Sequence, residues 1–333
     1  QSCCLSLLSS IAELLKPAPP IDPTISKALN RVAELVDPML RLAPGFEKHL
    51  AQPIKHALGY CDDLVAALPG PIDINRQAFS TNPLVHALFA TADDIDQMLG
   101  RSQAVRDFLA EPEGQNNEYF YALFAARRQQ KKQLGMAQQG DLIRNDVPQL
   151  VLYFSDQTLI EPSPQLDTAH LKLRCKALES LLQTFHAHVD SLRLERQGLR
   201  TDISIQRAHL TIVHGTTPGR EYVMQTRHLA ELDACLRQSS ESLMPEQIIQ
   251  ALAEFLRAPE PALHLVPASI TVDRSGIVCD PSDDDINVQT LNFAELTTRD
   301  KRLYLAMLAR ISRDEALEAV EKVRDQQHRF MLI

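Results

Sequence analysis

The sequence has 333 residues, of which 44% are hydrophobic, and its 34 basic and 43 acidic residues give a formal net charge of -9. This composition is typical of a folded protein long enough for two or three domains, and the acidic balance argues against nucleic acid as its general partner. Six cysteines without CxxC spacing exclude a zinc ribbon or a thioredoxin-like redox pair, so we expect reduced thiols and a cytoplasmic protein.

Residues 1–140 are interpreted as a helical domain whose helices are short because prolines, Pro53 among them, interrupt them. Apolar residues at helical spacing predict helices near residues 29–36 and 84–99. No stretch reaches the roughly 20 apolar residues of a membrane span, so a membrane is not an expected partner. An apolar stripe over residues 5–15 lacks flanking cations, which favours packing in this domain over docking on a membrane or a partner.

The chain begins with Gln1 and not with methionine, which leaves open whether a further segment precedes it. Residues 117–136 predict another helix, with aromatic residues on one side and cations at its end that complement the helix dipole. We interpret these cations as a charged helix end, because no second basic segment lies near them, and keep them as the candidate anion-binding residues. They are Arg127, Arg128, Lys131 and Lys132.

Residues 141–163 predict a short β-hairpin, with strands near 149–154 and 157–160 and a turn at Ser155 and Asp156. The turn residues separate two runs that are rich in Val, Leu, Tyr and Ile. We therefore expect a small β element between two helical parts of the chain.

The strongest pattern covers residues 171–213, where apolar residues recur at alternating steps of four and three. The spacing averages 3.5 residues, the period at which helices interlock and supercoil. A helix of this length reaches about 65 Å at about 1.5 Å per residue, so it needs a partner helix from the same chain or from a second copy. The apolar residues of this heptad seam are Leu171, Leu178, Leu182, Phe185, Val189, Leu192, Leu199, Ile203 and Leu210.

Residues 214–219 contain two glycines and a proline, which predict a stop before a second apolar helical stripe at residues 223–236. We expect an antiparallel helical hairpin over residues 164–240. Residues 241–333 predict an α+β module with a helix at 244–257, strands between 263 and 296, and helices at 300–311 and 313–329. A turn at residues 274–276 connects two of these strands.

The sequence contains no GxSxG or HExxH motif and no phosphate-binding glycine loop, so we predict no catalytic residue, no metal and no cofactor. His186, His188 and Asp190 are all potential metal ligands, but only His186 and Asp190 share a helical face, which favours a solvated surface. The acidic loop at residues 280–285 lacks the pattern of an EF-hand.

The fold predicted is mainly α with a small α+β part: a helical array, a long coiled-coil-like helical hairpin and short antiparallel β-hairpins. This pattern favours a non-enzymatic interaction or scaffold protein whose heptad helix braces the chain internally or forms a homodimer. The expected partner is another protein or a second copy, and not a nucleic acid. Two alternatives stay open, an enzyme with a site assembled from dispersed residues and a peripheral membrane or nucleic-acid adaptor.

Overall fold

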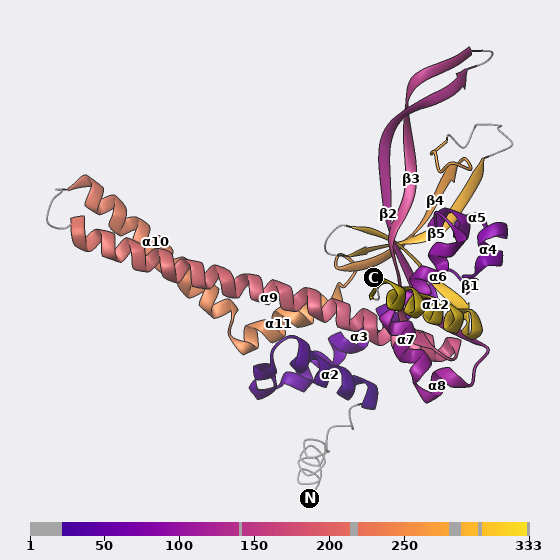
Figure 1. Cartoon of the computed structure of the whole chain (residues 1–333). Helices are drawn as coiled ribbons and strands as arrows, with labels where there is room; N and C mark the ends of the chain where they lie inside the picture. Colours follow the sequence, from indigo (N-terminus) through magenta and orange to yellow (C-terminus); the bar gives the residue numbers. More distant parts are fainter. Residues whose placement is uncertain (1–21, 140–141, 214–218, 280–287, 299–301, 332–333) are drawn as a thin grey trace, which may run out of the picture. The chain divides into compact units, whose positions relative to one another are not determined.

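The computed structural model describes residues 22–139, 142–213, 219–279, 288–298 and 302–331, and the chain divides into two compact units (Figure 1). Unit 1 comprises residues 1–56 and 185–256, and unit 2 comprises residues 57–184 and 257–333. Each unit therefore combines two segments that are far apart in the sequence. Across the described part of the chain, every helix is too short or too polar to cross a membrane.

A mixed α/β structure replaces the predicted mainly α fold. Six strands among the described residues form one sheet in unit 2, in the order β3, β2, β6, β5, β4, with β1 paired to β6. The pairing of β1 with β6 is parallel and the other pairings are antiparallel. The prediction of a mainly α fold with only short β-hairpins is therefore wrong. The strands are β1 (Ile72–Asp73), β2 (Tyr119–Gln139), β3 (Leu142–Ser163), β4 (Leu263–Val272), β5 (Gln289–Thr298) and β6 (Leu303–Ser312).

The helices predicted at residues 117–136 and 300–311 are the strands β2 and β6. Both segments are rich in Leu, Ala, Met and other residues of high helix propensity, and in both the tertiary structure overrides that preference. Residues 305–309 of β6 are all buried, which is typical of a strand covered on both faces. Such a run has no alternation, so its pattern does not distinguish a strand from a buried helix.

The hairpin predicted within residues 141–163 is one continuous strand, β3. Ala125 of β2 lies opposite Thr158, and two residues later Arg127 lies opposite Ser155, so β3 has one extra residue here. Asp156 has a φ of 55° at this point. The predicted turn is therefore a β-bulge, which bends a strand without ending it.

Residues 276–279 connect the two outer strands of the sheet. Val151 of β3 and Val272 of β4 form antiparallel bridges with Ile277 and Val278, respectively. The predicted turn at 274–276 is confirmed, and its Gly276 has a φ of 78°, a conformation that favours glycine. At this end of the sheet, residues 276–279 therefore link the two outer strands, β3 and β4, to each other.

Unit 2 has a hydrophobic core on each face of the sheet. On one face, Phe108 contacts Phe120 at a ring-centroid distance of 5.2 Å, and Phe89 contacts Phe124 at 5.9 Å. On the other, the end of α3 (Phe46–Ala66) and the start of α9 (Leu166–Val213) pack against β6. The other helices of unit 2 are α4 (Arg76–Thr81), α5 (Pro83–Leu88), α6 (Ala92–Arg101), α7 (Gln103–Ala110), α8 (Pro112–Gln115) and α12 (Arg313–Met331).

The described part of unit 1 is helical. Its helices α9 and α10 lie side by side in Figure 1. An ion pair of 3.1 Å joins Arg207 of α9 to Asp233 of α10. The long helix, the helical hairpin and the helices predicted at 244–257 and 313–329 are confirmed. Pro53 does not interrupt a helix as predicted but lies inside α3, between the buried Leu50 and Ile54. The helices of unit 1 besides α3 and α9 are α2 (Pro23–Leu35), η1 (Pro38–Leu42), α10 (Arg220–Ser242) and α11 (Pro245–Arg257).

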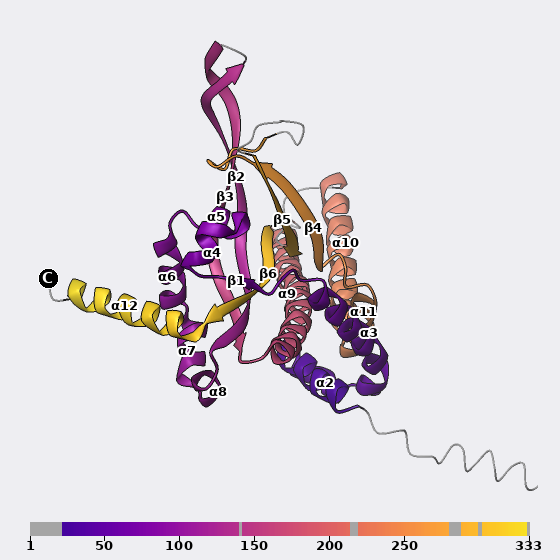
Figure 2. The same ribbon diagram turned by 90° about the vertical axis from the view of Figure 1, so that its right-hand side faces the viewer.

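The contact of α6 with α12 requires a glycine at position 100 (Figure 2). A Cβ at Gly100 would overlap the carbonyl oxygen of Ala319, whereas a Cβ at Gly59 of α3 would meet no atom within 4 Å. We predict that Gly100→Ala lowers the free energy of unfolding by about 1–3 kcal/mol because the helices must separate. Gly59→Ala should raise it by about 0.5–1 kcal/mol, because alanine restricts the unfolded chain. Urea unfolding of both variants tests this, and a stabilised Gly100→Ala variant would contradict the packing.

A network of ion pairs also joins α12 to the helices before β2. The Asp96 carboxylate lies 2.6 Å from Arg76 and 2.9 Å from Lys322, and both cations also contact Asp93. Burial alone would raise the pKa of the Asp96 carboxyl, but the hydrogen bonds and charges of Arg76 and Lys322 lower it below its usual value. The contact therefore stabilises the folded state where Asp96 is ionised.

Because the pKa of Asp96 is lower in the folded than in the unfolded chain, its contribution is present above about pH 4 and is lost as the pH falls through the folded value. We predict that Asp96→Asn lowers the free energy of unfolding by about 1 kcal/mol at pH 7. The effect is small because the partners Arg76 and Lys322 are about half exposed to solvent. The difference from the wild type should shrink below about pH 4 in urea unfolding measured across pH. Asp325→Asn, an exposed change on α12, serves as the control and should have no effect at either pH.

Candidate functional sites

The heptad seam lies mostly inside the chain. Its central residues are buried, which means that α9 contributes to the core along much of its length. The seam residues therefore pack mainly against other parts of the same chain. The exception is the first residue of the seam, Leu171, which is largely exposed. Leu178, Leu182, Phe185, Val189 and Ile203 are buried, Leu192, Leu199 and Leu210 are half-buried, and Leu171 is 54% exposed.

Polar side chains of α9 join the seam to the start of η1 in unit 1. His186 Nδ1 lies 3.0 Å from the carbonyl oxygen of Val36, and its Nε2 lies 3.0 Å from Asp190. Arg193 contacts Asp190 at 3.0 Å and Asp37 at 2.5 Å. His186 and Asp190 thus form structural contacts. The sequence pattern did not indicate that Arg193 forms ion pairs with Asp190 and Asp37. No group of three or more metal-ligating side chains occurs within the described ranges.

The four predicted anion-binding residues do not form one surface. They lie on β2, where neighbouring side chains point to opposite faces, so Arg127 and Lys131 share one face and Arg128 and Lys132 the other. Arg128 is also engaged, because its Nε lies 2.7 Å from Glu295 in a pair that is mostly buried. The arrangement provides two exposed lysines and not a cluster of four cations.

Strands β2 and β3 continue past the rest of the sheet as a two-stranded arm, residues 128–139 and 142–154 (Figure 1). β2 pairs with β6 only as far as Arg127, which lies opposite Tyr304. Beyond that point, within the part of the chain that is described, β2 pairs with β3 alone. Residues 276–278 hydrogen-bond to the outer side of β3 at Leu150 and Leu152.

On one face of the arm, β3 presents apolar side chains from the base outward, while β2 presents Lys132 opposite Leu150 before it reaches Leu134. Leu152 and Phe154 of β3 belong to the core at the base. Two and four residues further out come Leu150 and Pro148, and Pro148 lies opposite Leu134 of β2. Because side chains opposite one another share a face, the core face extends out along the arm. At its outer part Leu134 is 67% exposed, and Met136 is 72% exposed.

The edges of the arm are protected against pairing with a further strand, whereas its apolar face is open to a partner. Lys131 and Lys132 lie on β2, Pro148 lies on β3, and a register shift separates Gly135 from Ala137. Lysine, proline and bulges all oppose the addition of a further strand to an open edge. A partner of the arm would therefore pack on its apolar face.

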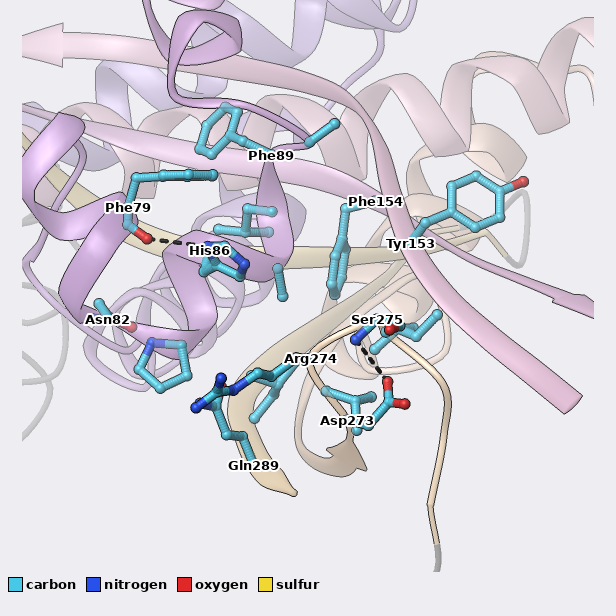
Figure 3. Close-up of a pocket in the computed structure, with 18 of the residues that line it drawn as sticks. Phe79, Asn82, His86, Phe89, Tyr153, Phe154, Asp273, Arg274, Ser275 and Gln289 are labelled. Atoms are coloured by element: carbon cyan, nitrogen blue, oxygen red, sulfur yellow. Dashed lines mark hydrogen bonds between the residues drawn. The ribbon is translucent and has the colours of Figure 1, made fainter. Parts of the chain in front are cut away.

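A cavity of about 690 Å³ lies at the base of the arm, within unit 2 (Figure 3). Its walls come from α4 and α5, the end of the arm strand β3, the turn after β4 and the start of β5. Aromatic and aliphatic side chains form one wall and polar ones the mouth. The lining residues used below are Phe79, Asn82, His86, Leu88, Phe89, Leu152, Phe154, Asp273, Arg274, Ser275, Gln289 and Leu291.

Three hydrogen bonds define polar groups of the cavity. His86 Nδ1 lies 3.2 Å from the carbonyl oxygen of Phe79, and because a carbonyl only accepts, Nδ1 is the donor. In the neutral ring the Nε2 lone pair is then free to accept a hydrogen bond. At the turn, Asp273 Oδ1 accepts from the backbone N–H groups of Ser275 and Ile277, each at 2.8 Å.

Cys61, Cys175, Cys235 and Cys279 are the cysteines among the described residues, and none of the four is in a disulfide there. Cys61 is fully buried, and burial raises the pKa of its thiol to about 12, so it stays protonated. Cys3, Cys4 and the acidic loop at residues 280–285 lie outside the described residues.

The sequence patterns did not indicate the cavity, because its walls come from segments around residues 79–90, 152–154, 272–276 and 289–291. A signal for the arm was present, since residues 149–154 are rich in Val, Leu, Tyr and Phe, but this run predicts only a short strand and not its extension into an arm. In comparisons with known proteins, the chain matches no family model, no curated protein and no solved structure. A functional proposal therefore depends on the arm, the seam and the cavity.

The burial of the seam predicts different costs for the same substitution on one helix. Leu182→Ala should lower the free energy of unfolding by about 2–5 kcal/mol, because it leaves a cavity in the core. Leu171→Ala, at the exposed start of the seam, is the matched control and should change it by less than about 0.5 kcal/mol. Denaturant unfolding measures both values, and a cost for Leu171→Ala equal to that of Leu182→Ala would contradict the assignment.

Proposed function

We propose that the protein is a non-enzymatic, cytoplasmic assembly protein in which the arm packs on a second copy of the chain. In this proposal α9 braces each copy internally, through the buried part of the seam. The single observation that supports the proposal most is the exposed apolar face of the arm, with Leu134 and Met136 about two-thirds exposed or more.

Burial of this face would supply a driving force for association. Removing a large aliphatic side chain from water is worth about 1.5–3 kcal/mol. A two-stranded ribbon is also marginally stable by itself in water and gains from a surface to pack on. Two copies related by a twofold axis would each cover Leu134 and Met136, since a symmetric interface buries the same patch twice.

The charge distribution favours a second copy over a nucleic acid or an anionic membrane. Residues 128–154 contain four basic and two acidic residues, while the whole chain has 34 and 43, which leaves 30 basic and 41 acidic residues elsewhere. The arm is thus attracted to the acidic remainder of another copy. A polyanion would be attracted by the arm but repelled by that remainder.

The test is the mass of the purified protein in solution, measured by light scattering over a range of concentrations. We expect a dimer for the wild type and a monomer for the double variant Leu134→Asp, Met136→Asp, because two charges on the apolar face oppose its burial. Leu194→Asp introduces a charge at another exposed leucine, which is 70% exposed on α9, and should leave the dimer intact. Circular dichroism establishes that all variants fold.

Salt provides a second measurement, because screening of the arm's charges should shift the dimer toward monomer as the ionic strength rises. A wild type that is monomeric at every concentration would overturn the proposal. If that monomer bound duplex DNA or anionic vesicles, and Lys131→Glu abolished the binding, the arm would belong to a nucleic-acid or membrane adaptor instead.

A further inference from the structure

The cavity at the base of the arm has the size and the shape of a small-molecule site. Its volume of about 690 Å³ falls within the roughly 300–1,000 Å³ of ligand pockets. Four separate segments of unit 2 form its walls, and each contributes residues to the core, namely Phe89, Phe154, Val272 and Leu291. The walls are therefore fixed before a ligand arrives, which lowers the entropic cost of binding.

The inner wall suits a flat apolar ring. Figure 3 shows His86 between Phe79 and Phe154, with Phe89 above Phe79 and His86 in this view. The rings of Phe79 and His86 lie with their centroids 4.7 Å apart, and the hydrogen bond from His86 to the Phe79 carbonyl fixes that arrangement. An aromatic ligand would gain both apolar burial and ring contacts here.

The mouth of the cavity suits an anion. Arg274 lies there, on the same side of the cavity as Asn82 and Gln289 (Figure 3). Arg274 forms no hydrogen bond or ion pair with a residue of the described ranges. The neighbouring Asp273 carboxylate directs its Oδ1 to the backbone N–H groups of its own turn and not to the Arg274 guanidinium. A free guanidinium binds a carboxylate through two parallel hydrogen bonds.

We infer that this cavity binds a small aromatic carboxylate, with the ring against Phe79, His86 and Phe154 and the carboxylate at Arg274. The site is distinct from the surface proposed for assembly, because its lining reaches the arm only at residues 152–154 of the base and does not include Leu134 or Met136. It requires no chemical step and no cofactor. The class of ligand follows from the aromatic and aliphatic inner wall and from the Arg274 cation among the polar residues of the mouth.

Isothermal titration calorimetry of the full chain with 2-naphthoate tests the inference, with the neutral 2-naphthamide as the comparison. We expect the acid to bind more tightly than the amide. Arg274→Gln should weaken binding of the acid by about tenfold or more, the usual effect of a lost hydrogen bond to a charged group, and leave the amide unchanged. Arg101→Gln, an exposed arginine of α6, is the matched control and should have no effect.

A fluorescent reporter localises the ligand, because the chain contains no tryptophan. Phe79→Trp introduces one in the cavity wall, and 2-naphthoate should change its emission over the concentrations at which the calorimetric heat appears. Equal affinities for acid and amide, binding unaffected by Arg274→Gln, or no binding at millimolar ligand would each overturn the inference. If Phe79→Trp does not fold, the calorimetry with Arg274→Gln decides alone.

Discussion

Backbone hydrogen bonding of β6 is the constraint on which unit 2 depends. Residues 305–309 are buried on both faces, so water does not satisfy their N–H and C=O groups and neighbouring strands must do so. β2 pairs along one side of β6, while β5 pairs with the first half of the other side and β1 with the second half. These partners lie near residues 72, 119–127 and 294–297, so the central strand forms only when distant segments come together.

The arm and the cavity follow from this arrangement. β2 is longer than β6, so its outer half has only β3 as a partner and continues as the arm. The core face of β3 extends along it, which leaves apolar side chains exposed where the sheet has ended. At the base, residues 276–279 close the sheet between β3 and β4, and the cavity lies where this turn faces α4 and α5. Assembly and ligand binding would thus use adjacent parts of one strand.

Unit 1 depends on a different device, the heptad seam of α9. The side chains of Phe185 and Val189 are buried, and Phe185 contacts Phe255 of α11 at a ring-centroid distance of 5.5 Å. Arg193 and Asp37 add a charged contact beside them. Internal packing of the seam explains why we assign association to the arm: apolar side chains that already contact their own chain are not free to bind another.

The sequence alone determined the elements whose stabilising contacts are local or periodic. The 3.5-residue spacing gave α9, a helical pattern with an acidic first turn gave α12, and the glycine in residues 274–276 gave the turn, because each depends on residues close together in the chain. Only the tertiary structure decided β2 and β6, whose Leu, Ala and Met favour a helix until buried hydrogen bonds to distant strands make them extended. Local sequence patterns could not predict the cavity for the same reason, since His86 and Arg274 line one cavity only after the sheet has formed.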